Sequence, residues 1–517
     1  MDNKNFDVSE LFLVGFNGTS VTEELKNYLD RFSFGGIILF SRNIRSFEQW
    51  NELAVSLQDI QKSKGKLPYL LAVDEEGGTV SRMPDDNATM PGARAIMETG
   101  DTHLAYTCAT IIGDVLLTMG CNLNLAPVLD VNVNPLNPGI GIRSFANNSH
   151  QVTVFGTAFL RGMKDTGILA CAKHFPGKGD ILRDSHKTLP VCSCLRSQIE
   201  EVHLPPFISA IRENIPCVMT SHAKYPSVDP YNPGTLSPVI LNDILRNELG
   251  FSGLILSDDM EMGAMRECGS IGENAYRAIM AGCDLLLICH TAELIEQAHT
   301  YLSDKLQTDN LFFNKCMEAY GRISELKTTL SWPCRIESFD MPVHATASAV
   351  AKHSVRIHKD ELSLIPIPAR FLESPILLCG AHFRSAVEVE IIGRTPYDII
   401  DMHRGLTQSI PNIRLLSWDL SPDQAVAETV ANHDFNQYRL IIVCANNAGL
   451  FPTQKNIIET ILERAPERTI FVAVKNPEDI ELFPQASSAV ATYGYNKVNI
   501  EALINLLFGA NHSAETG

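Results

Sequence analysis

One segment of the chain, residues 173–190, carries side chains suited to proton transfer. It reads KHFPGKGDILRDSHKTLP, and its Asp184 and His186 stand two residues apart. In an extended loop, residues i and i+2 point the same way, so Asp184 can accept a hydrogen bond from one imidazole nitrogen of His186 and fix its tautomer. The other nitrogen is then free to transfer a proton near neutral pH. Taken alone, an Asp-x-His pair is more often an exposed loop histidine beside an aspartate.

A second segment, LSDDMEM at residues 256–262, places a carboxylate directly after an apolar run. Asp258 could act there as a carboxylate nucleophile. It could also cap the N-terminus of a helix, although the neighbouring Asp259 could fill that role instead.

A third segment, VDEEGGTVSR at residues 73–82, also begins where an apolar run ends. Asp74 could hydrogen-bond two adjacent hydroxyl groups of a ligand. Arg82 could pair with that carboxylate or reach the ligand itself. From spacing alone, Asp74 could as well be only a salt-bridge partner.

Four more polar residues follow apolar runs or sit in Gly/Pro loops. Lys173 and His174 end a run, and Arg143 lies in the loop NPGIGIRSF at 137–145. His222 follows another run and could be a neutral donor. As single residues, a loop arginine is usually on the surface and a buried histidine is usually a satisfied core residue.

The elements that must position these residues read as a (β/α)8 barrel. Eight short apolar runs alternate with helical patterns such as SFEQWNELAVSLQDIQKS, and they lie at 11–16, 35–40, 69–74, 122–131, 167–175, 216–222, 253–259 and 283–290. The runs are continuous rather than alternating, which is typical of parallel strands buried on both faces. An open doubly wound sheet is the alternative fold. In a barrel the residues that end the strands share one face, where active sites are built; they are Asp74, Asp130, Lys173, His174, His222, Asp258 and His290.

The chain divides into two domains by pattern. We expect the barrel over 1–330, a linker over 331–350, which contains Pro333 and Pro342, and a smaller α/β sandwich domain over 351–517. The strands expected in the second domain are 375–380, 414–418, 440–446, 469–476 and 489–495. It contains no GxGxxG and no P-loop motif.

Composition restricts the partners. The net charge of −18 argues against a nucleic-acid binder and against docking on anionic lipid. The sequence shows no signal peptide and no apolar run long enough to span a bilayer, so we expect a cytoplasmic protein. Thirteen cysteines are scattered without a CxxC pair. Cys192 and Cys194 form a lone C-x-C with no second half for a zinc site, and we expect neither a metal nor a cofactor.

These motifs together resemble the glycoside hydrolase family 3 β-N-acetylglucosaminidases, of which the bacterial enzymes called NagZ are the nearest group. The resemblance runs over about residues 10–290, and its motifs occur in the family's order: VDEEGG, GIRSF, KHFPGKG with DSH, MTSHAKYP, TLSP and SDDMEM. The second domain is similar only loosely to the sandwich domain of two-domain members. Three positions depart from the pattern: Lys178 stands where histidine is usual, Thr79 where arginine is common, and Ile142 where aspartate is common.

The resemblance implies a retaining glycosidase. Asp258 matches the nucleophile, and His186 matches an acid/base oriented by Asp184. The positions that hold the sugar are matched by Asp74, Arg82, Arg143, Lys173, His174 and His222. The implied substrate is an N-acetylglucosamine-containing oligosaccharide or muropeptide. Family 3 β-glucosidases have S-D-W at the nucleophile, whereas this chain has S-D-D.

Other functions fit the same residues. Phosphate could replace water in the second step, which would make the enzyme a phosphorylase. The substrate's own acetamide could attack, with Asp258 or Asp259 polarising it. His174, His186, His222 and Asp258 could instead be ligands of a metal-dependent barrel hydrolase. A non-catalytic sugar-binding protein is the remaining alternative.

Overall fold

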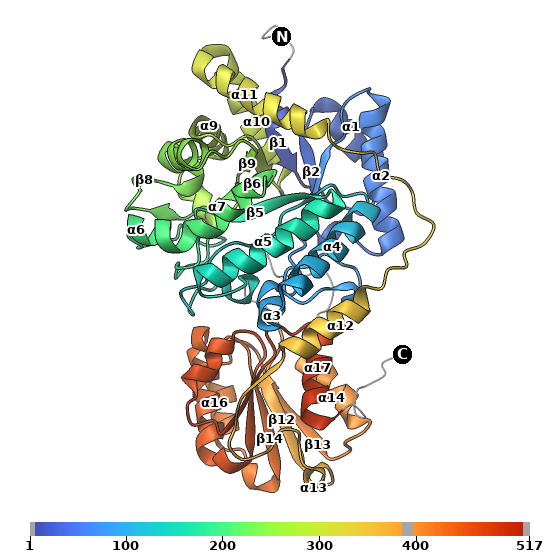
Figure 1. The fold of residues 1–517 in the computed structure, drawn as a ribbon, viewed down its shortest axis with the longest axis vertical. Coiled ribbons are helices and arrows are strands. Elements are labelled where there is room, and N and C mark those ends of the chain that lie inside the picture. The colour runs from blue at the N-terminus through green and yellow to red at the C-terminus, as the bar shows by residue number, and fades with distance from the viewer. Residues whose placement is uncertain (1–5, 385–396, 510–517) are drawn as a thin grey trace.

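The computed structural model describes residues 6–384 and 397–509. They form two parts, each built around one large sheet (Figure 1). The N-terminal part contains an eight-stranded parallel sheet, and the C-terminal part contains a six-stranded sheet. A small two-stranded hairpin, β7 (Lys224–Tyr225) and β8 (Asp229–Pro233), belongs to the N-terminal part. Within the described ranges, no helix is long and apolar enough to cross a membrane.

The eight-stranded sheet forms the predicted barrel. Its order is β10-β1-β2-β3-β4-β5-β6-β9, and a parallel bridge between Leu256 and Leu285 brings the two ends of that order together. This closure excludes the open doubly wound sheet. Each of the eight apolar runs contains one strand: β1 (Phe12–Val14), β2 (Gly36–Leu39), β3 (Leu70–Val73), β4 (Leu123–Asn124), β5 (Leu169–Phe175), β6 (Cys217–Thr220), β9 (Leu254–Leu256) and β10 (Leu286–Ile288).

Helices surround the barrel strands. The longer ones are α1 (Glu23–Arg31), α2 (Phe47–Ser63), α4 (Thr102–Thr118), α5 (Ser149–Thr166), α7 (Leu204–Arg212), a π-helix (Val239–Glu248), α9 (Ile271–Ala281), α10 (Ala292–Thr308) and α11 (Asn310–Lys327). The short helices are α3 (Ala93–Glu98), α6 (Arg196–Gln198) and α8 (Gly263–Arg266).

Local sequence explains how these helices begin and which face they bury. In α2, the Ser46 side chain accepts a hydrogen bond from the Gln49 amide at 3.2 Å, which caps the helix. Trp50, Leu53 and Leu57 then recur at helical spacing and are buried against the strands. The apolar face therefore fixes the helix on the barrel.

The six-stranded sheet confirms the predicted α/β sandwich. Its order is β11-β16-β15-β14-β12-β13, in which β11 alone is antiparallel to its neighbour. The strands are β11 (Arg356–Asp360), β12 (Ile376–Ala381), β13 (Ile413–Trp418), β14 (Leu440–Ala445), β15 (Thr469–Ala473) and β16 (Ser488–Ala491). The helices are α13 (Ala369–Leu372), α14 (Ile399–Thr407), α15 (Gln424–Ala431), α16 (Pro452–Arg464) and α17 (Lys497–Phe508).

The structure contains elements that were not expected from the sequence, among them β11 and α12 (Val343–Ser354). β11 lies at the sheet edge, and its residues RIHKD form no apolar run. Helix α12 begins inside 331–350, the segment expected to be a linker. Val343, Ala347 and Val350 recur at helical spacing and are buried, so this part of the segment packs as a helix.

The sandwich lies below α3 and α12 in the view of Figure 1, and its helix α17 contacts α12. Arg94 of α3 lies 3.5 Å from the Glu478 carboxylate. The Arg356 guanidinium donates to the Glu98 carbonyl oxygen. The second domain therefore supports the same barrel loops that follow strands β3 and β4.

Candidate active site

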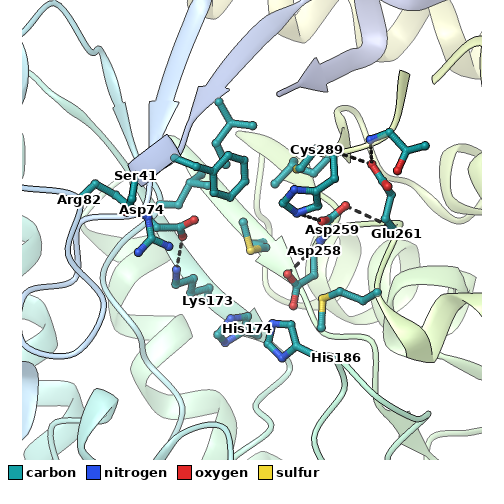
Figure 2. Close-up of a pocket in the computed structure, with 18 of the residues that line it drawn as sticks. Ser41, Asp74, Arg82, Lys173, His174, His186, Asp258, Asp259, Glu261 and Cys289 are labelled. Carbon is teal, nitrogen blue, oxygen red and sulfur yellow. Dashed lines mark hydrogen bonds and ion pairs between the residues drawn. The ribbon is translucent and has the colours of Figure 1, made fainter. Parts of the chain in front are cut away.

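A cavity with a volume of about 760 Å³ lies where the barrel strands end. Seven of the nine candidate site residues line it: Asp74, Arg82, Arg143, Lys173, His174, His186 and Asp258. Figure 2 shows Asp74, Arg82 and Lys173 on one wall, and Asp258 and Asp259 on the other, with His174 and His186 between them. Asp184 and His222 lie outside the lining.

Asp258 follows β9 directly and presents an ionised carboxylate to the cavity. Burial opposes ionisation, but the Lys178 ammonium and the His222 and His186 rings lower the pKa of Asp258 well below its usual range. Lys178 Nζ lies 3.4 Å from Asp258 Oδ2, and the Asp259 amide donates to Asp258 Oδ1 at 2.9 Å. Asp258 does not cap a helix, since α8 begins at Gly263 with Met262 as its N-cap.

His186 and Asp184 form a dyad on the loop that follows β5. His186 Nδ1 lies 2.7 Å from Asp184 Oδ1, and the His186 amide donates to the same oxygen at 3.0 Å. Burial raises the pKa of Asp184, but the hydrogen bonds from His186 and the positive charges of His186 and Lys178 together outweigh it, so the net shift is downward. An ionised Asp184 accepts the Nδ1 proton, which leaves Nε2 of His186 as the nitrogen available for proton transfer.

The backbone of this loop approaches the loop after β4 closely. A Cβ atom on Gly179 would lie 1.7 Å from the Val131 carbonyl oxygen. Only glycine permits that approach. The position of the loop that carries His186 therefore depends on this contact.

A network of buried charges forms the cavity wall that faces Asp258. Lys173 Nζ lies 2.7 Å from Asp74 Oδ1 and 2.6 Å from Glu76 Oε1. Arg143 donates through Nε and Nη2 to the two oxygens of Glu76, each at 2.8 Å. Burial opposes the charge of Glu76, but Arg143 and Lys173 lower the pKa of this carboxyl group to about 2. Burial likewise opposes the charge of Lys173, but Asp74 and Glu76 raise its pKa. The network holds Lys173 and Arg143 charged and fixed.

His174 lines the cavity and contacts Asp130. Its Nδ1 lies 2.7 Å from Asp130 Oδ2, while Asp130 Oδ1 accepts from the Lys178 amide at 2.7 Å. Burial, with the nearby Lys178, lowers the pKa of His174 well below its usual range. Its other nitrogen, Nε2, is then left for a ligand. The Lys173–His174 peptide bond is cis, and both side chains line the cavity.

His222 differs from the expectation that it contacts a sugar. It is fully buried, and its two ring nitrogens contact protein atoms: Nδ1 lies 2.7 Å from Thr235 Oγ1, and Nε2 lies 2.9 Å from the Asp259 carbonyl oxygen. Burial lowers the pKa of His222, so the ring is neutral. We therefore interpret His222 as a residue that positions the Asp258–Asp259 segment.

The structure also adds site residues that the sequence reasoning missed. Glu76 lies in the same acidic run as Asp74, and Asp130 was noticed only as a strand end. Lys178 was noticed only as a departure from the family pattern. The wall beyond Asp259 adds Glu261. It also includes His290, which was noticed only as a strand end and whose Nε2 lies 3.1 Å from Asp259 Oδ2. The closeness of Glu76 to Asp74 in the sequence could have identified Glu76 as a site residue. The contacts of the other residues join loops that are distant in the sequence, so no local pattern indicates them.

The arrangement does not support the metal-dependent alternative. Its four expected ligands were His174, His186, His222 and Asp258. His174 Nδ1, His186 Nδ1 and both nitrogens of His222 lie against protein acceptors or donors. Within residues 6–384 and 397–509, these four do not form a group whose ligand atoms lie within 4.8 Å of one another.

The chain is similar in sequence to known proteins. The model of the "Glycosyl hydrolase family 3 N terminal domain" matches residues 5–326. "Beta-hexosaminidase A" of Pseudoalteromonas piscicida is 29% identical, over 92% of this chain and 86% of that protein. "Beta-hexosaminidase" of Nitrosomonas eutropha is 36% identical, over 55% of this chain and 82% of that protein.

A solved structure is similar over both domains. It is a glycoside hydrolase family 3 beta-N-acetylglucosaminidase from Paenibacillus sp. str. FPU-7, with 28% identity and a TM-score of 0.87. The similarity covers 98% of this chain and 97% of that one. With a family model that matches more than half of its length, the chain belongs to glycosyl hydrolase family 3.

Proposed function

We propose that this chain is a retaining β-N-acetylglucosaminidase that removes terminal N-acetylglucosamine from oligosaccharides such as peptidoglycan fragments. The observation that carries the proposal is the pairing, across one cavity, of the ionised Asp258 with the His186–Asp184 dyad. The names of the relatives, two beta-hexosaminidases and a beta-N-acetylglucosaminidase, support the same activity.

The first step forms a covalent glycosyl–enzyme. A carboxylate oxygen of Asp258 attacks the anomeric carbon while the bond to the leaving oxygen breaks. His186, protonated at Nε2, donates that proton to the leaving oxygen, and the alcohol departs. Asp184 holds the ring by its Nδ1–H and stabilises the imidazolium before donation.

The second step releases the sugar and restores the enzyme. Neutral His186 accepts a proton from water at Nε2, and the water oxygen attacks the anomeric carbon. The bond to Asp258 breaks, and the carboxylate returns to its ionised form. Two inversions at the same carbon give net retention.

The charge network supplies the sugar-binding groups. Asp74 can accept hydrogen bonds from hydroxyl groups, and the cations of Lys173 and Arg143 can donate to them. Arg82 and the free nitrogen of His174 border the same space. Because Glu76 already fixes the side chains of Lys173 and Arg143, these side chains lose little conformational freedom when substrate binds.

A phosphorylase is the second candidate, favoured by the contact of Lys178 with Asp258. This ammonium, with Arg266 on the same cavity, reduces the repulsion that a phosphate would meet from the nucleophile. Phosphate would then replace water in the second step and yield a sugar 1-phosphate.

The test compares p-nitrophenyl N-acetyl-β-glucosaminide with the β-glucoside, for the wild type and three variants. We expect cleavage of the glucosaminide, loss of at least about 10³-fold in kcat with Asp258→Asn, and loss of about 10²-fold or more with Asp184→Asn. Asp259→Asn is the matched control, since the neighbouring carboxylate has no covalent role. Faster turnover with phosphate, together with sugar 1-phosphate, would identify the phosphorylase.

The covalent step has its own test. A 2-fluoro glycoside should add its sugar to Asp258, as located by peptide mass spectrometry. An inhibited enzyme without that adduct, and with Asp259→Asn as damaging as Asp258→Asn, would favour attack by the substrate's acetamide. A wild-type protein that binds N-acetylglucosamine but cleaves neither substrate would be a non-catalytic binding protein. Release of N-acetylglucosamine from purified muropeptides, compared with chitobiose, tests the natural substrate.

A further inference from the structure

Four side chains able to ligate a metal lie together outside the cavity, at the base of the loop that carries His186. They are Asp180, Cys192, Cys194 and His203. Cys194 Sγ lies 2.8 Å from Cys192 Sγ, 3.1 Å from Asp180 Oδ2 and 3.7 Å from His203 Nε2. The ligand atoms of Asp180, Cys192 and Cys194 all lie within 4.8 Å of one another. The fold thus brings two further potential ligands, Asp180 and His203, next to the lone C-x-C of the sequence.

Three of the four side chains of the cluster are buried. Cys192 and His203 are 0% and 2% exposed, and Cys194 is 6% exposed, whereas Asp180 is half-buried. The Nδ1 atom of His203 is buried and has no hydrogen-bond partner within the described residues. A buried imidazole nitrogen without a partner is costly and calls for an explanation. The other ring nitrogen, Nε2, lies 3.7 Å from Cys194 Sγ, so the ring already faces the cluster.

The backbone holds the two cysteines in place. The Cys192 amide donates to the Lys224 carbonyl oxygen at 2.9 Å, on strand β7. The Ser227 hydroxyl donates to the Cys194 carbonyl oxygen at 2.7 Å. The sulfur atoms are therefore presented by an anchored segment.

His203 is also anchored, at the end of a π-helix (Ile199–His203) that joins α6 to α7. Gly177 packs on it so closely that a Cβ atom there would lie 2.8 Å from His203 Cβ. Isolated π-helical turns often occur at functional sites. The ring is thus held between the start of the loop and the two thiols.

We propose that Asp180, Cys192, Cys194 and His203 bind one thiophilic divalent cation, with Zn²⁺ the ion that fits best. Two thiolates, one imidazole and one carboxylate make a tetrahedral S₂NO ligand set of the kind zinc accepts. On binding, the two thiols lose their protons to solvent and the imidazole binds in its neutral form. Zinc–sulfur bonds of about 2.3 Å place two sulfurs about 3.8 Å apart, so the thiols separate as the ion enters.

The position of the site indicates what the ion would do. Asp180 precedes the Asp184–His186 dyad in the chain, and Cys192 and Cys194 follow it. A metal bound to all of them would tie the two ends of the loop together without touching the reacting atoms. The ion is therefore structural in this proposal, and the readout of its binding does not depend on whether the proposed glycosidase activity is correct.

The experiment measures metal stoichiometry in the full chain under anaerobic, reducing conditions. Protein stripped with a chelator is given Zn²⁺ or Co²⁺, dialysed, and measured by elemental analysis and native mass spectrometry. We expect one ion per chain, and a thiolate-to-cobalt charge-transfer band with Co²⁺. Cys192→Ser and Cys194→Ser should each abolish the band, and His203→Ala should weaken Zn²⁺ binding about 10-fold or more. Cys334→Ser, at an exposed cysteine, should keep one ion and the band.

Three results would overturn the proposal. The first is no uptake of Zn²⁺ or Co²⁺ by the wild type at micromolar metal. The second is uptake that persists in Cys192→Ser and Cys194→Ser, which would place the ion elsewhere. The third is an intact mass lower by two hydrogens with a peptide that links Cys192 to Cys194, because a disulfide would exclude the metal. If the serine variants fail to fold, the cobalt band of the wild type alone tests for thiolate ligation.

Discussion

Replacing Glu76 with glutamine removes a buried negative charge that Arg143 and Lys173 share. The two cations lie 2.6–2.8 Å from its oxygens, and its side chain is 5% exposed. The pKa falls from 4.5 to about 2 on folding. That lowering of the pKa corresponds to about 3 kcal/mol of stability at pH 7. Breaking a buried ion pair typically costs about 3–5 kcal/mol, so we expect Glu76→Gln to lose about 3 kcal/mol.

The stability that Glu76→Gln loses should decrease as the pH falls. Because folding lowers the pKa of Glu76, its contribution is complete above 4.5 and is lost as pH falls through about 2. Protonation linkage removes about 2 kcal/mol of the contribution by pH 3. The difference in stability between the wild type and Glu76→Gln should therefore shrink by more than half between pH 7 and pH 3.

Urea unfolding of both proteins at pH 7, 5 and 3 measures these differences. Glu318→Gln is the matched control, because Glu318 is exposed and its ion pairs with Lys315 at 3.4 Å and Arg322 at 3.9 Å should together contribute less than about 1 kcal/mol. We also expect kcat/KM of Glu76→Gln to fall at least about 10-fold, since Lys173 and Arg143 lose their fixed positions. A variant as stable as the wild type at pH 7, or a difference that does not change with pH, would refute the reasoning.

Two further predictions concern the loop after β5. Lys178→Glu replaces the cation 3.4 Å from Asp258 with a second carboxylate, which should raise the pKa of Asp258. The acid limb of the plot of kcat/KM against pH should then move upward by about 2 pH units or more. An unmoved acid limb would show that Lys178 does not control the pKa of the nucleophile. Gly179→Ala puts a Cβ atom 1.7 Å from the Val131 carbonyl oxygen, so the backbone must shift and kcat/KM should fall about 10²-fold. Gly321→Ala, where a Cβ atom meets nothing within 4 Å, should leave kcat/KM unchanged, and equal activity of the two variants would contradict the role of this contact.

The sequence by itself determined the barrel, the order of its strands and seven of the polar residues on the cavity wall. Strands buried on both faces must be continuous apolar runs, and all eight runs became strands. A residue that ends such a strand must lie on one face of the barrel, which placed Asp74, Lys173 and Asp258 at one cavity. The same logic could not find β11, because an edge strand with one neighbour needs no apolar run.

Only the tertiary structure decided which side chains face the cavity and which support it. His222 follows a strand as predicted, yet it points to Thr235 because a strand-end position does not specify the direction of a side chain. The contact of Lys178 with Asp258 joins residues 80 positions apart, and no local pattern encodes it. His203, nine residues beyond Cys194, joins the C-x-C only because the π-helical turn brings its ring back to the loop. Local spacing predicts elements, whereas pairings between loops depend on how the closed barrel brings strand ends together.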